Sequence, residues 1–152
     1  MTNSMPNAAE LLGSRRRVLV TGGAGFIGGA VVRRLLRESD AIVFNLDKMG
    51  YASDLTSIEE VFSELGDGAD QRHVLQQVDL ADATAVREAV QAADPDLVMH
   101  LAAESHVDRS IAGPGVFIES NVTGTYNLLQ AVREHYDSLN AERKEHFRLH
   151  HI

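Results

Sequence analysis

The hydrophobic and polar positions of this chain form two kinds of block that follow one another in regular order. Short continuous apolar runs rich in β-branched residues predict buried strands, and apolar residues three and four positions apart predict amphipathic helices. The predicted strands cover 17–21, 41–46, 73–78, 97–101 and 147–152. The predicted helices begin near Phe26 and cover 57–65, 83–93 and 114–136.

The alternation of strands and helices predicts the fold class. Strands separated by single helices form a parallel sheet that is covered on both faces, so we expect an α/β, doubly wound, Rossmann-type sheet of about five strands. Ligands of such sheets bind at the carboxyl ends of the strands. The residues at those ends are Thr21, Asp47, Asp79 and 101–105. We therefore expect them to meet at one crevice.

The turn after the first predicted strand is rich in glycine. Residues 18–29 read VLVTGGAGFIGG. These glycines fit two spacings of nucleotide sites, G-x-G-x-x-G starting at Gly23 and G-x-x-G-x-x-G starting at Gly22. In the second, Gly22 makes the turn, Gly25 permits the close approach of a pyrophosphate, and Gly28 packs the helix tightly against the strand. The alternative is a plain strand-to-helix connection.

An acidic residue stands at the end of the second predicted strand. Asp47 lies 19 residues after Gly28, close to the spacing of about 20 residues at which an acid bonds the ribose in dinucleotide sites. A carboxylate there accepts hydrogen bonds from both hydroxyls of the adenosine ribose and repels the additional phosphate of NADP. Asp47 therefore predicts NAD as the cofactor. Two alternatives stay open: Asp47 as a strand-end cap, and Lys48 as a cation that tolerates the phosphate.

Composition narrows the classes of protein to consider. The chain has 152 residues, 44% of them hydrophobic, which suits one domain with its own core. Acidic residues outnumber basic ones by 22 to 14, and the net charge of −8 disfavours nucleic acid as a partner. Cysteine is absent, which excludes disulfides and thiolate metal sites and favours a cytoplasmic location. The spacing of the seven histidines predicts no metal site.

The segment before the first predicted strand reads MTNSMPNAAELLGS. It lacks the basic start and the apolar stretch of a signal peptide, and no later segment is long and apolar enough to span a membrane. We expect residues 1–14 to be a disordered leader and residues 15–152 to form an NAD-binding domain, with no membrane as a partner.

Four segments of the chain resemble one enzyme family. They are TGGAGFIG at 21–28, LDKMGYA at 46–52, MHLAAESHVDRSI at 99–111 and GPGVFIESNVTGTYNLLQA at 113–131. This set is similar to the nucleotide-sugar branch of the extended short-chain dehydrogenases, and within it to the dTDP-glucose 4,6-dehydratases. HLAAESHVDRS is its most specific part, because sugar epimerases share the glycines and HLAA but not usually the ESHVDRS run.

The resemblance implies a reaction and a set of binding residues. The family uses NAD to oxidise C4 of dTDP-glucose, removes water across C5 and C6, and returns the hydride to C6. By resemblance, Phe26 and Ile27 present backbone at the pyrophosphate, Asp47, Lys48, Met49 and Gly50 surround the adenosine ribose, and Asp79 and Leu80 flank the adenine. The nicotinamide side is lined by Leu101, Ala102, Ala103, Glu104 and Ser105, Ser120 contacts the cofactor, and Ser105 and His106 face the dTDP-sugar nucleotide.

Two departures from the family pattern affect the expected cofactor contacts. Gly50 and Ser120 both stand where the family has threonine. One hydrogen bond contributes about 0.5 to 1.5 kcal/mol, so we expect Gly50 to weaken NAD binding by up to about tenfold. Ser120 keeps a hydroxyl, and we expect little loss there.

The catalytic residues that the resemblance implies are not among these 152 residues. The family has a Thr-Asp-Glu run and a Tyr-x-x-x-Lys pair after the strand that here ends at Ile152. None of Tyr51, Tyr126 and Tyr136 is followed four residues later by lysine. We therefore predict no catalytic residue, an incomplete sheet, a truncated domain and no substrate domain. The resemblance also implies a homodimer, as in full-length members.

Three hypotheses about function stay open. The chain is the NAD-binding part of a dTDP-glucose 4,6-dehydratase and is inactive alone, or it is a non-catalytic NAD-binding or partner-binding module that another chain complements. The third hypothesis is that it is part of another nucleotide-sugar epimerase or dehydratase.

Overall fold

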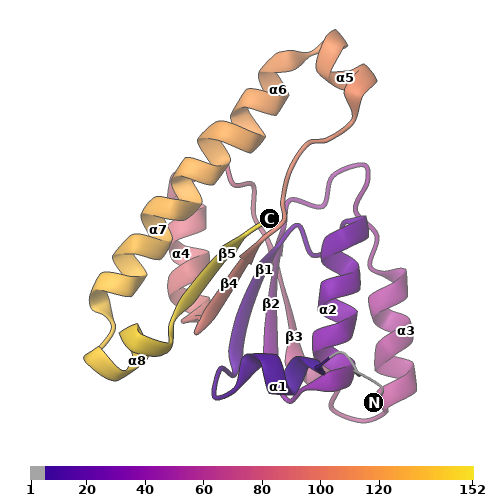
Figure 1. The fold of residues 1–152 in the computed structure, drawn as a ribbon. Coiled ribbons are helices and arrows are strands. Elements are labelled where there is room, and N and C mark those ends of the chain that lie inside the picture. The colour runs from indigo at the N-terminus through magenta and orange to yellow at the C-terminus, as the bar shows by residue number, and fades with distance from the viewer. Residues whose placement is uncertain (1–5) are drawn as a thin grey trace, which may run out of the picture.

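The computed structural model describes residues 6–152 as a parallel sheet with helices on both faces (Figure 1). The strands are β1 (Arg17–Thr21), β2 (Ile42–Asp47), β3 (His73–Gln77), β4 (Leu97–His100) and β5 (Arg148–His151). The longer helices are α2 (Phe26–Glu38), α3 (Thr56–Leu65), α4 (Ala83–Ala93) and α7 (Thr125–Ser138). The shorter helical segments are α1 (Ala8–Leu12), η1 (Asp70–Arg72), α5 (Val107–Ala112), α6 (Pro114–Ile118), η2 (Glu119–Gly124) and α8 (Ala141–His146).

The strands lie in the order β3-β2-β1-β4-β5, and every neighbouring pair is parallel. β1 is the central strand, where Val18 pairs with Val43 of β2 on one side and with Leu97 of β4 on the other. From β1 the sheet grows in one direction through β2 and β3 and in the opposite direction through β4 and β5. Open α/β sheets bind ligands at such a switch point. The predicted doubly wound parallel fold class is confirmed.

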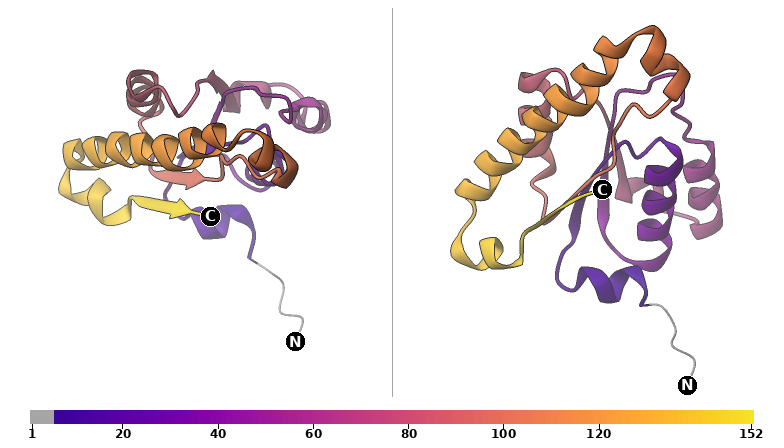
Figure 2. Two further views of the ribbon diagram at one scale, coloured as in Figure 1. Left: turned by 90° about the horizontal axis from the view of Figure 1, so that it is seen from above. Right: turned by 45° about the horizontal axis from the view of Figure 1, so that its top comes forward.

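Alternate residues of the strands face two separate hydrophobic layers. Val18 and Val20 of β1 pack in the layer that α1, α2 and α3 cover. Leu19 of β1 and Phe44 of β2 pack in the layer that α4 and α7 cover. Successive side chains of a strand point to opposite faces, so the sheet needs helices on both sides to be buried. Figures 1 and 2 show α2 and α3 on one side of the sheet and α4 and α7 on the other.

Part of the predicted leader is an ordered helix. The Asn7 side chain caps α1 by accepting from the Glu10 N–H at 2.9 Å, and the Glu10 carboxylate accepts from the Asn7 N–H at 3.1 Å. Ala8 and Leu12 are buried in the layer of α2. The prediction of a disordered leader is therefore wrong for this segment, which is too short to show a helical period in the sequence. Residues 1–5 of that leader lie outside the described residues.

The helix predicted over 114–136 is present but is not uniform. α6, η2 and α7 follow one another without a break, and η2 is π-helical. A π-helical segment holds one residue more per hydrogen-bonded turn than an α-helix. Pro114 occupies the first turn of α6, where its missing N–H costs nothing.

Besides α1 and the short segment η1, the sequence also did not predict α5 and α8. α5 lies in the segment expected to be a loop, and α8 precedes β5 with its first turn capped by Asn140, which accepts from the Arg143 N–H at 2.9 Å. Both helices have six residues and none of these is buried. Without a buried face they carry no apolar period, which is the signal that identifies helices in a sequence.

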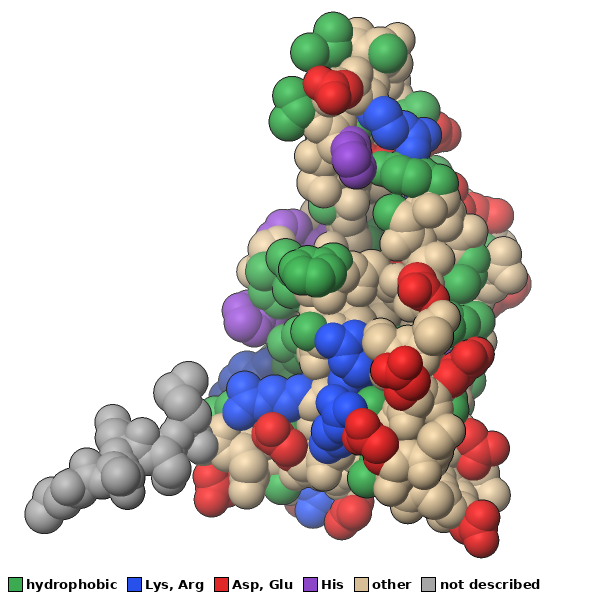
Figure 3. Space-filling model, turned by 90° about the vertical axis from the view of Figure 1, so that its right-hand side faces the viewer, with side chains coloured by type: hydrophobic (Ala, Val, Ile, Leu, Met, Phe, Trp, Pro, Cys, Tyr) green, Lys and Arg blue, Asp and Glu red, His purple; other side chains and the backbone are tan. Residues whose placement is uncertain are grey.

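α5 and α6 extend beyond the carboxyl edge of the sheet (Figure 1). In the space-filling view the top of the molecule is a narrow column that carries hydrophobic side chains at its end (Figure 3). Val107 and Ile111 of α5 and Ile118 of α6 are 69%, 77% and 59% exposed. Over residues 6–152 no helix combines the length and the apolar character needed to cross a membrane.

Candidate functional site

The glycine turn joins β1 to α2 at the carboxyl edge of the sheet. Gly22 has a φ of +70°, and a Cβ there would lie 2.7 Å from the Ala102 Cα, a distance that side chains do not tolerate. A Cβ on Gly28 would overlap the Gly22 carbonyl oxygen and lie 2.7 Å from the Gly22 carbonyl carbon. The first turn of α2 therefore packs directly on the end of β1. The predicted roles of Gly22 in the turn and of Gly28 in close packing are confirmed.

The first turn of α2 presents backbone donors. Its N-cap residue, Gly25, has no side chain to accept from them, and the N–H groups of Phe26, Ile27 and Gly28 make no hydrogen bond within residues 6–152. The side chains of Phe26 and Ile27 are 96% and 63% exposed. A helix N-terminus carries partial positive charge, so these donors suit an anion such as a phosphate.

Asp47 ends β2 and is buried. Its Oδ2 accepts from the Ala24 N–H in the glycine turn at 3.0 Å, and its Oδ1 accepts from the Met49 N–H and the Ser53 hydroxyl, both at 2.8 Å. Met49 has a φ of +56°, which non-glycine residues adopt only occasionally. The carboxylate thus ties the glycine turn to the loop after β2, and Gly50 lies exposed in that loop. The predicted contact of Asp47 with a ribose stays a prediction.

An ion pair bridges the loop after β2 and the loop after β4. Lys48 Nζ donates to Glu104 Oε1 at 2.9 Å, and the two side chains are 35% and 12% exposed. The Glu104 backbone is held by the Asn121 amide of η2, which accepts from the Glu104 N–H at 2.8 Å and donates to the Glu104 carbonyl at 2.9 Å. Burial by itself lowers the pKa of the Lys48 ammonium, but the neighbouring carboxylates, Glu104 first among them, raise that pKa above its ordinary value.

A buried polar chain connects the ends of β1 and β4 with α7. Thr21 Oγ1 accepts from two backbone N–H groups after β4 at 3.2 and 3.1 Å, so its own hydroxyl hydrogen donates to His100 Nδ1 at 2.6 Å. His100 Nε2 then carries the ring proton and donates to Thr125 Oγ1 at 3.0 Å. Burial, followed by the neighbouring His151, lowers the pKa of His100 to about 4. His100 is therefore neutral at pH 7.

His100, Thr125 and Asn121 were not among the residues predicted from the sequence. One signal for His100 was present, because a histidine ends the otherwise apolar run LVMH. A polar side chain in a buried strand needs a hydrogen-bond partner, and that requirement pointed to a structural network. Thr125 and Asn121 lie on helical faces with no such signal, because their partners come from distant parts of the sequence.

The remaining predicted residues differ in how accessible they are. The Leu80 side chain is buried in the layer of α4 and α7, which leaves only its backbone available to a ligand, and Asp79 beside it is exposed. Ser105 and His106 are exposed before and at the start of α5. Ser120 is half-buried in η2. The half-buried Leu101 and Ala102 and the exposed Ala103 follow β4.

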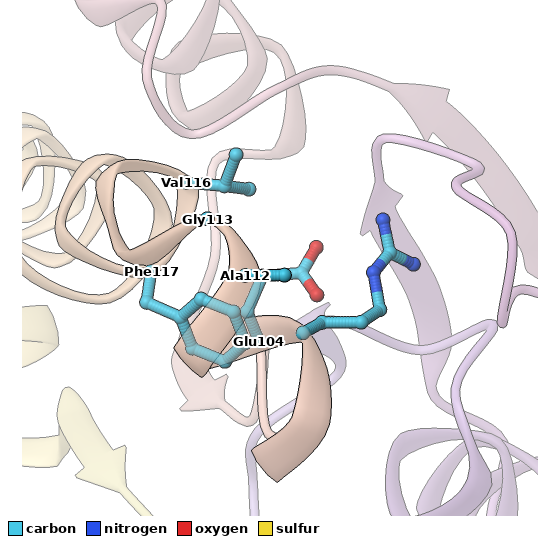
Figure 4. Close-up of a pocket in the computed structure, with 6 residues that line it drawn as sticks. Glu104, Ala112, Gly113, Val116 and Phe117 are labelled. Atoms are coloured by element: carbon cyan, nitrogen blue, oxygen red, sulfur yellow. The ribbon is translucent and has the colours of Figure 1, made fainter.

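An aromatic contact links α5 to the loop after β2. The Arg109 guanidinium lies 3.8 Å from the centroid of the Tyr51 ring. The centroid of the His106 ring lies 5.8 Å from the same Tyr51 centroid. Beside this contact is an open hollow of about 250 Å³ (Figure 4). It is lined by Glu104, Arg109, Ala112, Gly113, Val116 and Phe117. Glu104 thus belongs both to the ion pair with Lys48 and to the wall of this hollow.

The family described as GDP-mannose 4,6 dehydratase matches residues 19–152. The chain belongs to this family. The matched region of this GDP-mannose 4,6 dehydratase family member includes the glycine turn, the Lys48–Glu104 ion pair and the buried polar chain around His100. The resemblance to nucleotide-sugar dehydratases drawn from the sequence is confirmed.

Several proteins named as dehydratases are similar to this family member. The dTDP-glucose 4,6-dehydratase of Shigella flexneri is 48% identical over 136 residues, which cover 90% of this chain and 36% of that protein. The dTDP-glucose 4,6-dehydratase 1 of Escherichia coli (strain K12) is 47% identical with the same coverage. The chain therefore spans about 36% of the length of these relatives.

Two solved structures show the same arrangement of the fold. DesIV, a dTDP-glucose 4,6-dehydratase from Streptomyces venezuelae solved with NAD bound, has a TM-score of 0.67 and 40% identity, and the match covers 78% of this chain and 36% of that chain. The UDP-glucose 4-epimerase of Thermus thermophilus in complex with NAD has a TM-score of 0.63 and 35% identity, with 78% and 34% covered.

Proposed function

We propose that this chain is the NAD-binding part of a dTDP-glucose 4,6-dehydratase. The observation that carries the proposal is the glycine turn. It sets the N–H groups of the first turn of α2, which have no partner among residues 6–152, beside the buried carboxylate of Asp47. This combination fits a pyrophosphate next to a ribose. The similarity to dTDP-glucose 4,6-dehydratases, one of them solved with NAD, supports the same proposal.

The proposed contacts with NAD follow the accessible groups. The N–H groups of Phe26 and Ile27 bind the pyrophosphate. Asp47 already accepts three protein hydrogen bonds, and a carboxylate has about four lone-pair positions, so it accepts one ribose hydroxyl rather than both. The other proposed neighbours of NAD are Lys48, Met49, Gly50, Asp79, the Leu80 backbone, residues 101–105 and Ser120. When bound, NAD supplies hydride acceptance and return.

We also propose that the whole protein binds a dTDP-sugar nucleotide, forms a homodimer and works in the cytoplasm. The exposed Ser105 and His106 are available to the sugar nucleotide. An apolar stripe supports the dimer, because side chains four, four and three positions apart on α6, η2 and α7 are exposed by 42% to 60%. These residues are Ile118, Val122, Tyr126 and Leu129.

Titration calorimetry with NAD tests the cofactor site. We expect the chain to bind NAD and the Gly25→Ala variant to bind it about tenfold or more weakly, because the new methyl group occupies the space through which a phosphate approaches the helix. A Cβ on Gly25 would lie 3.2 Å from the Gly22 carbonyl oxygen, so the fold needs only a small adjustment. Far-UV circular dichroism checks that the variant keeps the fold.

Gly29→Ala is the matched control for this titration. It adds the same methyl group to the same helix, where a Cβ would meet only ordinary contacts of 3.4 and 3.5 Å. We expect Gly29→Ala to bind NAD as the wild type does. Equal affinity of the Gly25 and Gly29 variants, or no binding by the wild type, would contradict the proposed site.

A polypeptide of residues 1–152 alone is expected to show no dehydratase turnover. No tyrosine in it is followed four residues later by lysine, and a lysine that lowers the pKa of a tyrosine is what lets the phenolate take the C4 hydroxyl proton. Incubation with dTDP-glucose and NAD, followed by chromatography for the 4-keto-6-deoxy product, measures this. Product from the pure polypeptide would refute the expectation. Product only after addition of a chain that carries the Tyr-Lys pair would favour complementation.

A further inference from the structure

Lys48 occupies a position that bears on the choice between NAD and NADP. It directly follows Asp47, and a cation close to the ribose acid is what accommodates the additional phosphate in NADP sites. A free ammonium here would weaken the discrimination that Asp47 provides. In the structure this ammonium is not free, because Nζ donates to Glu104 Oε1 at 2.9 Å.

The charges around Lys48 are predominantly negative. Besides Glu104, the carboxylates of Asp79 and Asp47 also act on the Lys48 ammonium. Three carboxylates against the Lys48 ammonium and the Arg109 guanidinium, which lines the hollow beside Glu104, leave this corner of the crevice with a net negative charge. A phosphate monoester carries a charge of about −1.5 to −2 at pH 7 and is therefore repelled unless the ammonium turns toward it.

Glu104 is held in place independently of Lys48. Its backbone N–H and carbonyl are both bonded to the Asn121 amide, at 2.8 and 2.9 Å. Its side chain is only 12% exposed, so water and salt screen the ion pair less than they screen a pair on the open surface. Glu104 is therefore the partner whose backbone is fixed, and the long Lys48 side chain reaches across to its carboxylate.

We infer that Glu104 is a specificity-determining residue that keeps Lys48 away from the additional phosphate of NADP and so makes the site selective for NAD. The inference rests on the proposed NAD function. It assigns the discrimination to two residues that lie 56 positions apart in the sequence, in addition to Asp47.

The ratio of the NADP and NAD dissociation constants in Glu104→Gln tests the inference. The amide keeps the size of the side chain but removes its charge, which releases the ammonium. We expect calorimetry to show NADP gaining on the order of tenfold relative to NAD, as one added close charge contact predicts. The control is Glu134→Gln, which removes an ion pair of similar length, 2.8 Å, that Glu134 of α7 makes with Arg87 of α4 on the more exposed surface. Its ratio is expected to stay at the wild-type value.

A double-mutant cycle separates the release of Lys48 from the simple loss of a negative charge. The effects of coupled residues are not additive. In the Lys48→Gln background we therefore expect Glu104→Gln to raise the logarithm of the NADP affinity relative to NAD by less than about half of what it does when Lys48 is present. If the Glu104→Gln variant does not fold, the Glu104→Asp variant is used in its place. That variant keeps the charge, draws the carboxylate back by one methylene group, and is expected to give a smaller gain.

The outcomes distinguish this inference from the proposed function. Binding of NAD by the wild type with an unchanged NADP ratio in Glu104→Gln and Glu104→Asp overturns the inference alone. An equal gain in both Lys48 backgrounds does so as well. A wild-type chain that binds neither nucleotide overturns the proposed function and the inference together.

Discussion

Gly28→Ala is expected to destabilise the domain by about 2 to 4 kcal/mol. The added Cβ would lie 2.7 Å from the Gly22 carbonyl carbon and 2.9 Å from the Gly23 Cα. Both are backbone atoms, which cannot move aside as the end of a flexible side chain does. α2 must therefore shift away from the end of β1, and the buried packing of α2 on the sheet is lost in part. Urea unfolding followed by circular dichroism measures the change in the free energy of unfolding.

Gly29→Ala is the control for this substitution as well. It lies one residue further along α2 and makes contacts no closer than 3.4 Å. Because alanine favours a helix over glycine by up to about 1 kcal/mol, Gly29→Ala is expected to leave stability unchanged or to raise it slightly. Unfolding of the Gly28 and Gly29 variants at the same urea concentration would contradict the close packing of α2 on the glycine turn.

The stability of the domain is expected to fall as the pH drops from about 6.5 toward 4, with His100 as a main cause. The pKa of His100 is lowered from 6.5 to about 4 in the folded protein. Below pH 6.5 the His100 imidazole therefore binds a proton in the unfolded chain but stays neutral in the folded protein, and this difference favours unfolding. The loss grows to about 2 to 3 kcal/mol near pH 4 and then levels off. Thermal melting between pH 7 and pH 4 measures this loss.

His100→Asn isolates this contribution. We expect the variant to be less stable than the wild type at pH 7, because the hydrogen bond to Thr125 is lost, and to lose less stability on acidification. His73 also has a pKa lowered by burial, so part of the slope remains. The exposed His146 of α8 provides the control variant His146→Asn, which should keep the wild-type slope. A His100→Asn slope equal to that of the wild type would contradict the neutral, buried state of His100.

The main elements of the fold could be predicted because their signals are local. Each buried strand needs an unbroken apolar run, and helices such as α4 bury one face at regular spacing, with Val86, Ala89, Val90 and Ala93 inward. α1, α5 and α8 have five, six and six residues. α1 has a capping box and packs on α2, and Arg109 of α5 contacts Tyr51 in another loop. Such contacts join distant parts of the sequence and leave no period within it.

The residues of the candidate site also divide into those with a local signal in the sequence and those whose partners lie far away in it. The glycine turn is predictable because the backbone geometry of Gly22 and the packing of Gly28 are properties of a few adjacent residues. Asp47 could be placed by its distance from the glycines, but its three protein partners could not be foreseen. The direction of Lys48 is decided by Glu104, and nothing near Lys48 in the sequence shows where that carboxylate lies.

The π-helical segment η2 adjusts the rotational phase between two parts of one helix. Each residue of an α-helix turns the chain by about 100°, so the additional residue of a π-helical turn rotates everything before it relative to everything after it. Leu128, after η2, faces the buried layer of the sheet, whereas Asn121, within η2, holds the Glu104 backbone. One continuous helix thus supports the core through Leu128 and the crevice through Asn121, and the π-helical segment sets the rotation between its two parts.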